Sequence, residues 1–493
     1  MAVGPPPPAA ASPAPAGTAP PLCAARSRQY LLAAAILASA LGFIDGSIVS
    51  IAMPAMRETL GASLPQAQWI ANAYFLTLSA LILAGGALAD RLGLVRVFAT
   101  GIAVFVAASL ACAAAPSPET LIAARAAKGT GAALMIPGSL ALIARAYPPA
   151  ERGAAIGLWA AASAVTTALG PLLGGAALSL GGAEMWRALF AINLPLGTLA
   201  LWLLLAHAER ETERTGRAID WPGAALATAS LGLIAWALTG PNGAGGLLAG
   251  ALGIAAFAAF LAVEHRRAEP MMPLGLFADP TFAAANAITL LIYFALATVT
   301  FFLPMAAISA WEVPEWAAGA ALLPLTAAVG GLSRPMGALA ARIGPRRPIT
   351  LGAGLVALAY AGLAFTAPAG AFWAATFPFL CVMGLGMGIV VAPLSTAVMG
   401  AVPDTDSGTA SGVNNAISRV ASLLAVAAMG WLAAERYTAA DGPESFAAGG
   451  VAATEAHRAA TEAALAAQCG TVAALALIAT ALAWTRLSDA PHG

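Results

Sequence analysis

Long apolar runs alternate with short polar segments along most of the chain. Fourteen of these runs can each form a helix that crosses a bilayer, since about 20 residues at ~1.5 Å rise span a hydrocarbon core of about 30 Å. The pattern therefore predicts an all-α polytopic membrane protein with fourteen transmembrane helices. The predicted segments are 30–54, 69–89, 95–115, 120–144, 153–179, 186–206, 221–239, 244–264, 281–304, 316–340, 348–366, 371–399, 408–433 and 466–485.

The composition agrees with this class. Hydrophobic residues make up 60% of the chain and charged residues only 9%, against about 25% charged residues in soluble proteins. The formal net charge is zero, which argues against a nucleic-acid partner and leaves the lipid bilayer as the expected surroundings. The four cysteines are scattered without metal-ligand spacing, so we expect neither a metal site nor a cofactor.

The basic residues predict the orientation in the membrane. With the N-terminus inside, fifteen arginines fall in inner loops and tails and four in outer loops. This asymmetry predicts a multi-pass protein with both termini in the cytoplasm. Arginine far outnumbers lysine and alanine is abundant, which is typical of a bacterial GC-rich genome and favours the bacterial inner membrane. Four basic residues lie within predicted segments: Arg125, Lys128, Arg334 and Arg419.

An internal repeat is visible. Residues 86–96 and 337–347 agree at seven of eleven positions at an offset of 251, and a second match, Gly129-x-Gly131 with Gly384-x-Gly386, runs at an offset of 255. Segments 1–6 therefore repeat as segments 9–14 in the same orientation, with segments 7 and 8 inserted between them. Two parallel six-helix halves around a central site are typical of alternating-access transporters.

These patterns predict five regions. A Pro/Ala-rich cytoplasmic tail over 1–29 is expected to be disordered, because proline blocks helix formation. The N-terminal half covers 30–206, the inserted helices and their linkers 207–280, the C-terminal half 281–485, and a second cytoplasmic tail 486–493.

Asp45 is the acid that lies deepest in a predicted segment. It sits about 22 Å along the first helix from Tyr30 and about 14 Å from Pro54, near the membrane midplane. A carboxylate there costs at least ~2.5 kcal/mol, so it is normally kept for function. Desolvation disfavours the charged form, which favours a proton carrier or a counter-charge for a cation. The alternative is an acid neutralised by a nearby cation for structural reasons.

Arg125 and Lys128 lie three residues apart, on one face of the fourth segment. An intramembrane arginine usually pairs with an acid or with backbone carbonyls, and the nearest deep acid is Asp45. The alternative is that both side chains extend to the outer surface. Gly129 and Gly131 supply a small surface for close helix packing.

Several motifs together resemble the major facilitator superfamily, and more closely its branch of fourteen-helix drug:proton antiporters. The similarity covers nearly the whole chain after the Pro-rich tail. The motifs are FIDGSIVSIAMP at 43–54, GALADRLG at 86–93, RAAKG at 125–129, GPLLGG at 170–175, Trp186-Arg187 with Asn193-x-Pro195, and Asp220-Trp221-x-Gly223.

The resemblance implies roles for individual residues. Asp45 and Arg125 fall on positions tied to proton transfer. Positions tied to gating and conformational change are Asp90, Arg91, Gly93, Gly170, Pro171, Gly174 and Gly175.

The chain also departs from the family pattern. Lys128 stands where relatives usually have glutamine, Leu94 and Val95 replace a basic pair, Thr166 replaces a glycine, and Ala188 replaces a second tryptophan. Segment 13 lacks the acid found in relatives that export dications. These departures favour neutral or monovalent substrates, and Lys128 extends the range to anionic ones.

The predicted function is proton-coupled efflux of small lipophilic drugs, or of an antibiotic or metabolite, by a monomeric secondary transporter that is not an enzyme. A proton-coupled importer of the same fold is the main alternative. A membrane-embedded transferase is disfavoured because the four histidines are scattered, and a sensor because the longest extramembrane stretch is short. Candidates for the substrate cavity are Lys128, Trp69, Asn72, Phe75, Asn286, Tyr293, Asn414 and Asn415.

Overall fold

The computed structural model describes residues 22–209, 220–240, 243–403, 406–443, 445–448 and 454–488. Every regular element in these ranges is helical. Most of the predicted N-terminal tail and the last five residues lie outside the described ranges, so the disorder predicted for the tails stays a prediction.

Fourteen helical spans in the described ranges are long and apolar enough to cross a membrane, which confirms the predicted fold class. Spans six and ten are each built from two helices in line. The α-helices are α1 (Arg28–Leu60), α2 (Leu64–Leu92), α3 (Leu94–Ala113), α4 (Pro118–Ala146), α5 (Pro149–Gly181), α6 (Trp186–Ala191), α7 (Asn193–His207), α8 (Trp221–Thr239), α9 (Ala244–Arg266), α10 (Pro280–Ser309), α11 (Glu315–Ala320), α12 (Leu323–Ile343), α13 (Arg346–Thr366), α14 (Phe377–Gly400), α15 (Ser407–Ala439) and α16 (Glu455–Arg486).

Local chemistry explains where several helices begin. Ser63 and Ser117 each form a capping box at the start of α2 and α4, with a proline in the first turn. Asp279 caps α10 by accepting a hydrogen bond from the backbone of Phe282. These caps satisfy backbone donors that have no partner within the helix. The last helix, α16, begins at Glu455, well before the predicted segment, because its Ala-rich first turns favour helix although they carry charges.

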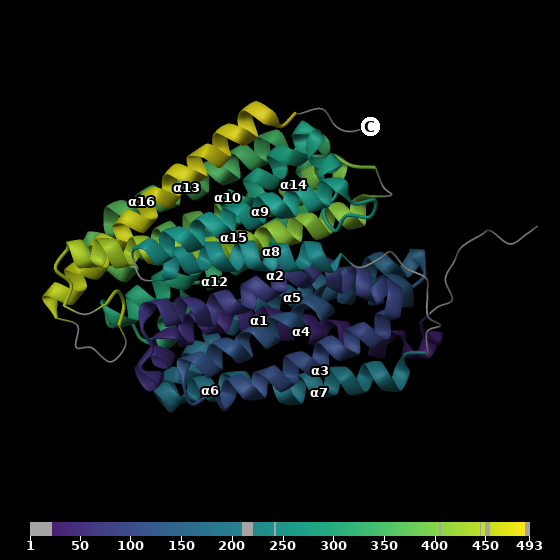
Figure 1. Ribbon diagram of the computed structural model, residues 1–493, viewed down its shortest axis with the longest axis horizontal. Helices are drawn as coiled ribbons and strands as arrows, with labels where there is room; N and C mark the ends of the chain where they lie inside the picture. Colours follow the sequence, from purple (N-terminus) through teal and green to yellow (C-terminus); the bar gives the residue numbers. More distant parts are fainter. Residues whose placement is uncertain are drawn as a thin grey trace, which may run out of the picture.

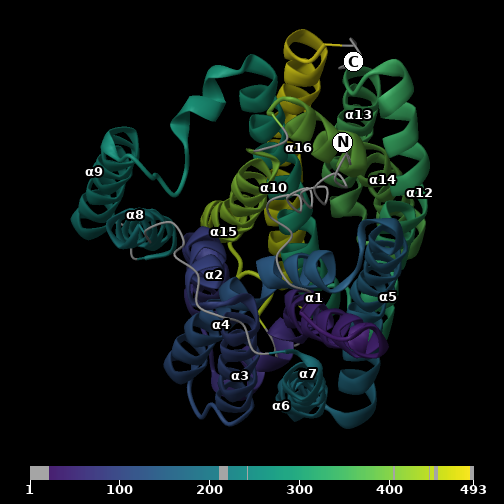
Figure 2. The same cartoon turned by 90° about the vertical axis from the view of Figure 1, so that its right-hand side faces the viewer.

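The helices form two bundles that lie side by side, α1 to α7 in one and α10 to α16 in the other (Figure 1). The inserted pair α8 and α9 lies against one flank, where α8 contacts α2 and α15 (Figure 2). Trp69 on α2 donates a hydrogen bond to Thr239 on α8 over 2.8 Å, and Ala235 of α8 packs against Leu423 and Ala427 of α15. The inserted helix α8 therefore holds both bundles at the seam between α2 and α15.

The internal repeat is present in the three-dimensional structure. Gly93 and Gly344, which correspond in the repeat, both end a helix with positive φ, 96° and 83°. Only glycine adopts such a conformation readily. Close packing repeats as well. A Cβ on Gly131 would lie 2.9 Å from the Gly101 carbonyl oxygen, and one on Gly386 would lie 2.8 Å from that of Gly352.

Polar contacts join the halves at one end of the bundle. We call the two ends the Gly61 end, which holds the turn between α1 and α2, and the Gly93 end, which holds the turn between α2 and α3. At the Gly61 end, buried Arg57 of α1 donates to the carbonyl oxygens of Phe446 and Ala447 over 2.8 and 2.7 Å. Gln68 of α2 donates to the Val426 carbonyl oxygen over 2.8 Å.

Helix α5 adds to the contact between the halves at the Gly61 end. Within the other half, it packs more extensively against the short helix α11 than against the longer α12. A Cβ on Gly175 of α5 would lie 2.2 Å from the Glu315 carbonyl oxygen, and one on Gly319 of α11 would lie 2.2 Å from that of Pro171. Ser179 also donates a hydrogen bond to the Glu315 carboxylate over 2.7 Å. The two backbones touch here because neither helix has a side chain between them.

Candidate proton-coupling site

Asp45 lies in the middle of α1, and only 2% of its surface is exposed. The neighbouring Gly46 faces open space, because no heavy atom lies within 4 Å of the position that its Cβ would take. The carboxylate is thus enclosed by protein, while the adjoining turn of α1 borders unfilled volume.

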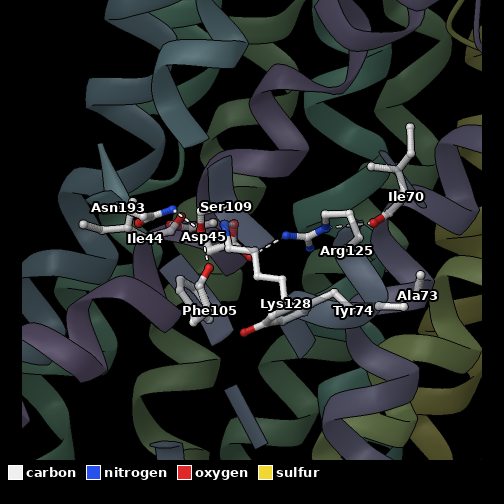
Figure 3. Close-up of polar contacts among 12 residues, drawn as sticks. Ile44, Asp45, Ile70, Ala73, Tyr74, Phe105, Ser109, Arg125, Lys128 and Asn193 are labelled. Carbon is white, nitrogen blue, oxygen red and sulfur yellow. Dashed lines mark hydrogen bonds and ion pairs between the residues drawn. The ribbon is translucent and has the colours of Figure 1, made fainter. Parts of the chain in front are cut away.

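Two cations from α4 hold the Asp45 carboxylate (Figure 3). The Arg125 Nη1 atom lies 2.5 Å from Oδ2, and the Lys128 Nζ atom lies 2.5 Å from Oδ1. Each oxygen therefore has its own cationic donor. The spacing of three residues places both donors on one face of the helix, and the ion pair between Arg125 and Asp45 that the sequence suggests is present.

Close contact between α4 and α2 brings the cations to this depth. A Cβ on Gly129 would lie 2.4 Å from the Tyr74 carbonyl oxygen, so only glycine permits this approach. Arg125 Nε then donates to the Ile70 carbonyl oxygen over 2.9 Å. One guanidinium therefore connects α1, α2 and α4.

Aromatic rings surround the cations. The Tyr74 ring centroid lies 4.5 Å from Arg125 Cζ, and the Phe105 and Phe190 centroids lie 4.7 and 4.6 Å from Lys128 Nζ. The negative faces of these rings attract cations most strongly where water is absent, and Lys128 is fully buried. With all three groups ionised the cluster carries one excess positive charge.

The corresponding positions of the second half are apolar. The repeat offsets place Leu325 opposite Tyr74, and they place Leu380 and Met383 opposite Arg125 and Lys128. The structure supports this correspondence, because Gly384 packs on Leu325 as Gly129 packs on Tyr74. The chemistry of the cluster is therefore confined to one half of the repeated scaffold.

The residues expected to act in gating lie along the contact of α5 with α1 and at the Gly93 end. Gly170 and Gly174 allow α5 to approach α1, since their Cβ atoms would lie 2.2 Å from Ser47 Oγ and 2.9 Å from Ile48 Cγ1. Asp90 and Arg91 are exposed in the last turn of α2, at the Gly93 end.

Three of the cavity candidates form side-chain hydrogen bonds within the protein. Trp69 bonds to Thr239 of the inserted helix α8. Asn286 is buried and donates to the Phe282 carbonyl oxygen, while exposed Asn415 donates to that of Ser411.

The remaining candidates on α2, α10 and α15 differ in their surroundings. The Asn414 amide oxygen accepts a hydrogen bond from Thr289 of α10 over 2.8 Å. Asn72 is fully buried, and neither its amide oxygen nor its amide nitrogen has a partner. Phe75 and Tyr293 are half-buried.

The sequence did not single out two residues near this cluster. Tyr74 was not among the candidates, although a tyrosine four residues after Ile70 shares the face of α2 that meets Arg125. The sequence marks Arg419 only as a charge within a segment. The signal that could identify it is the absence of any acid between Ser407 and Trp431 of α15.

Two repeated six-helix halves with a buried charge cluster define a membrane transport protein. The model of the Major Facilitator Superfamily matches residues 35–426, and the chain belongs to this family. It is 34% identical over 409 residues to the methylenomycin A resistance protein of Streptomyces coelicolor, covering 80% of this chain and 84% of that relative. It is 31% identical to the tetracenomycin C resistance and export protein of Streptomyces glaucescens, covering 81% of this chain and 76% of the relative.

The fold is also similar to a solved structure. A bacterial homolog of the human lysosomal transporter Spinster, crystallised in an inward-facing and unoccupied conformation, superposes with a TM-score of 0.69 at 19% identity. The match covers 96% of this chain and all of that one.

Proposed function

We propose that this transporter exports a small drug, antibiotic or metabolite across the bacterial cell membrane in exchange for protons. The observation that carries the proposal is the Asp45 carboxylate, buried mid-membrane and held by Arg125 and Lys128. The names of two relatives add support for efflux, since they describe antibiotic resistance and export. The chain acts as a monomeric secondary transporter, with both termini and the Gly93 end in the cytoplasm.

Protonation of Asp45 is the coupling step. A proton from outside binds the carboxylate, which loses its charge and its ion pairs with Arg125 and Lys128. Two buried cations then lack a counter-charge, an arrangement that strongly disfavours the packing of α1 against α4. Release of the proton to the cytoplasm restores the ion pairs. The charge state of one carboxyl thus biases two arrangements of the same helices.

The second part of the transport cycle is the opening and closing of the contact between the halves at the Gly61 end. In the structure this end is closed by Arg57, Gln68 and the α5–α11 contact. Release of substrate to the outside requires these contacts to separate while the Gly93 end closes, with Asp90 and Arg91 acting at that end. Export thus alternates between closure at one end and closure at the other.

Substrate-driven proton movement in everted membrane vesicles tests the proposal. Wild-type vesicles should dissipate a preformed proton gradient when a transported compound from a panel of drugs and dyes is added. Asp45→Asn should abolish this response with the protein still inserted and monodisperse. Glu58→Gln, an exposed acid near the end of the same helix, should behave as wild type. Proton release by the Asp45→Asn variant at the wild-type rate would refute the coupling role, and uptake that runs with the proton would identify an importer.

A further inference from the structure

Arg419 is a basic residue in the middle of α15 that takes no part in the proton-coupling cluster. It lies on the opposite half from Asp45 and is half-buried. Its Nε atom is buried without a hydrogen-bond partner. Within the described ranges, the guanidinium forms no ion pair and stacks on no ring.

Arg419 lies in the part of α15 that meets both α2 and α10. Asn414, five residues before it, accepts a hydrogen bond from Thr289 of α10. Leu423, four residues after it, packs in one cluster with Phe75 and Leu76 of α2.

The middle thirds of the described spanning helices contain one acid, Asp45, against the basic residues Lys128, Arg334 and Arg419, of which Arg334 is exposed. Asp45 already forms ion pairs with Arg125 and Lys128, so the central region has a surplus of positive charge.

An unpaired guanidinium at this depth is costly and is normally retained for function. It presents a planar fork of donors that matches a carboxylate in bidentate geometry. A carboxylate would supply the counter-charge that the described part of the protein does not provide for Arg419.

We propose that Arg419 is the anion subsite of the transported compound and takes its carboxylate group where α2, α10 and α15 meet. The inference rests on the proposed efflux function and specifies the substrate class: small amphipathic acids rather than cations. Helix α2 links this subsite to the proton site, because its Tyr74 ring lies over Arg125 and α15 packs against the same helix.

Transport of matched probes tests the subsite. Proteoliposomes containing the full chain would be assayed for uptake of 1-pyrenebutyric acid, its uncharged methyl ester and the cation ethidium. Wild type should transport the acid saturably and in preference to ethidium. Arg419→Gln should raise the KM for the acid about 10-fold or more, since a hydrogen bond to a charged group is lost, while ester transport changes less than about 2-fold. Arg419→Lys should fall between them, since it keeps the charge but loses the fork.

Two further variants strengthen the comparison. Arg419→Glu should reverse the charge preference, so that ethidium is transported better than the acid. Arg436→Gln, an exposed arginine near the end of the same helix, should leave all three probes unchanged. The reversal is a gain of activity, which a merely misfolded variant cannot produce.

The outcomes separate this inference from the function on which it rests. Equal loss of acid and ester transport in Arg419→Gln, or full retention of acid transport, would overturn the anion subsite. Wild-type transport of ethidium without the acid would overturn the substrate class while leaving proton-coupled efflux standing. In Asp45→Asn, the pyrene acid should no longer trigger proton movement, while equilibrium binding should still prefer the acid over its ester. This combination would support both the proton-coupling role of Asp45 and the anion subsite at Arg419.

Discussion

Lys128 and Asp45 form an ion pair across α4 and α1, with Nζ 2.5 Å from Oδ1, although Arg125 already occupies the other carboxylate oxygen at 2.5 Å. The lysine is the feature that separates this cluster from a simple pair. One carboxylate compensates two buried cations, and the rings of Phe105 and Phe190 contribute the remaining stabilisation of the ammonium.

The first prediction concerns the stability of the cluster. Asp45→Asn should lower the melting temperature, because removal of one partner of a buried ion pair costs roughly 3–5 kcal/mol. The double variant Asp45→Asn with Lys128→Gln should recover part of this loss, since one of the two uncompensated cations is gone. Thermal unfolding of the purified proteins in detergent measures both. A double variant less stable than Asp45→Asn alone would show that Lys128 does not depend on Asp45 for compensation.

The second prediction concerns the contact between α4 and α2. Gly129→Ala should destabilise the protein by about 1–3 kcal/mol, because the new Cβ would lie 2.1 Å from Thr77 Oγ1 and 2.4 Å from the Tyr74 carbonyl oxygen. Gly46→Ala is the matched control, because its Cβ meets no atom within 4 Å. Equal melting temperatures for the two variants would contradict the packing described here.

The third prediction concerns separation of α5 and α11. Ser179→Cys with Glu315→Cys, joined by a short bis-maleimide, should block transport, because these residues are hydrogen-bonded across the halves at the Gly61 end. The four native cysteines, which form no disulfide, are first replaced by alanine. Gln66→Cys with Glu119→Cys is the matched control, because this bonded pair lies within the N-terminal half. Transport that persists with the first pair fully cross-linked would exclude separation at this contact.

The fourth prediction concerns two carboxyl groups beside α8. Among the described residues, no N–H or O–H donor reaches Glu264 Oε1 or Asp220 Oδ2, although Arg267 pairs with the other Asp220 oxygen over 3.2 Å. A Cβ on Gly223 would lie 2.5 and 2.7 Å from Oε1 and Oδ2, so the two oxygens are neighbours. Two such groups repel each other when both are ionised. Glu264→Gln supplies a donor at this point and should raise stability at pH 8 by about 1 kcal/mol.

Its control variant is Glu264→Ala. This change also removes the repulsion, but it deletes the Oε2 atom that accepts a hydrogen bond from the backbone of Met272 over 2.7 Å. It should therefore be less stable than Glu264→Gln in thermal unfolding at pH 8. A glutamine variant less stable than wild type would show that both carboxyl groups are satisfied as they stand.

The sequence by itself determined the spans, the repeat and the principal charge pair. A membrane-crossing segment must satisfy its backbone hydrogen bonds within itself, so a local apolar run is sufficient to identify it. The repeat followed from identical turn residues, because Gly93 and Gly344 occupy the same positive-φ turn. The pair between Asp45 and Arg125 followed from the cost of isolated charges in a low-dielectric medium.

Tertiary structure alone decided which side chains meet around these elements. Whether Lys128 reaches Asp45 or the membrane surface depends on the rotation of α4, which is set by the contact of Gly129 with α2. Trp69 meets the inserted helix, and Arg419 is left without an acid, because of how α2, α8 and α15 pack. Several helices, among them α8, α9, α10 and α14, are apolar on nearly all sides, so the sequence carries little periodic signal for their facing. Packing of distant helices supplies that information instead.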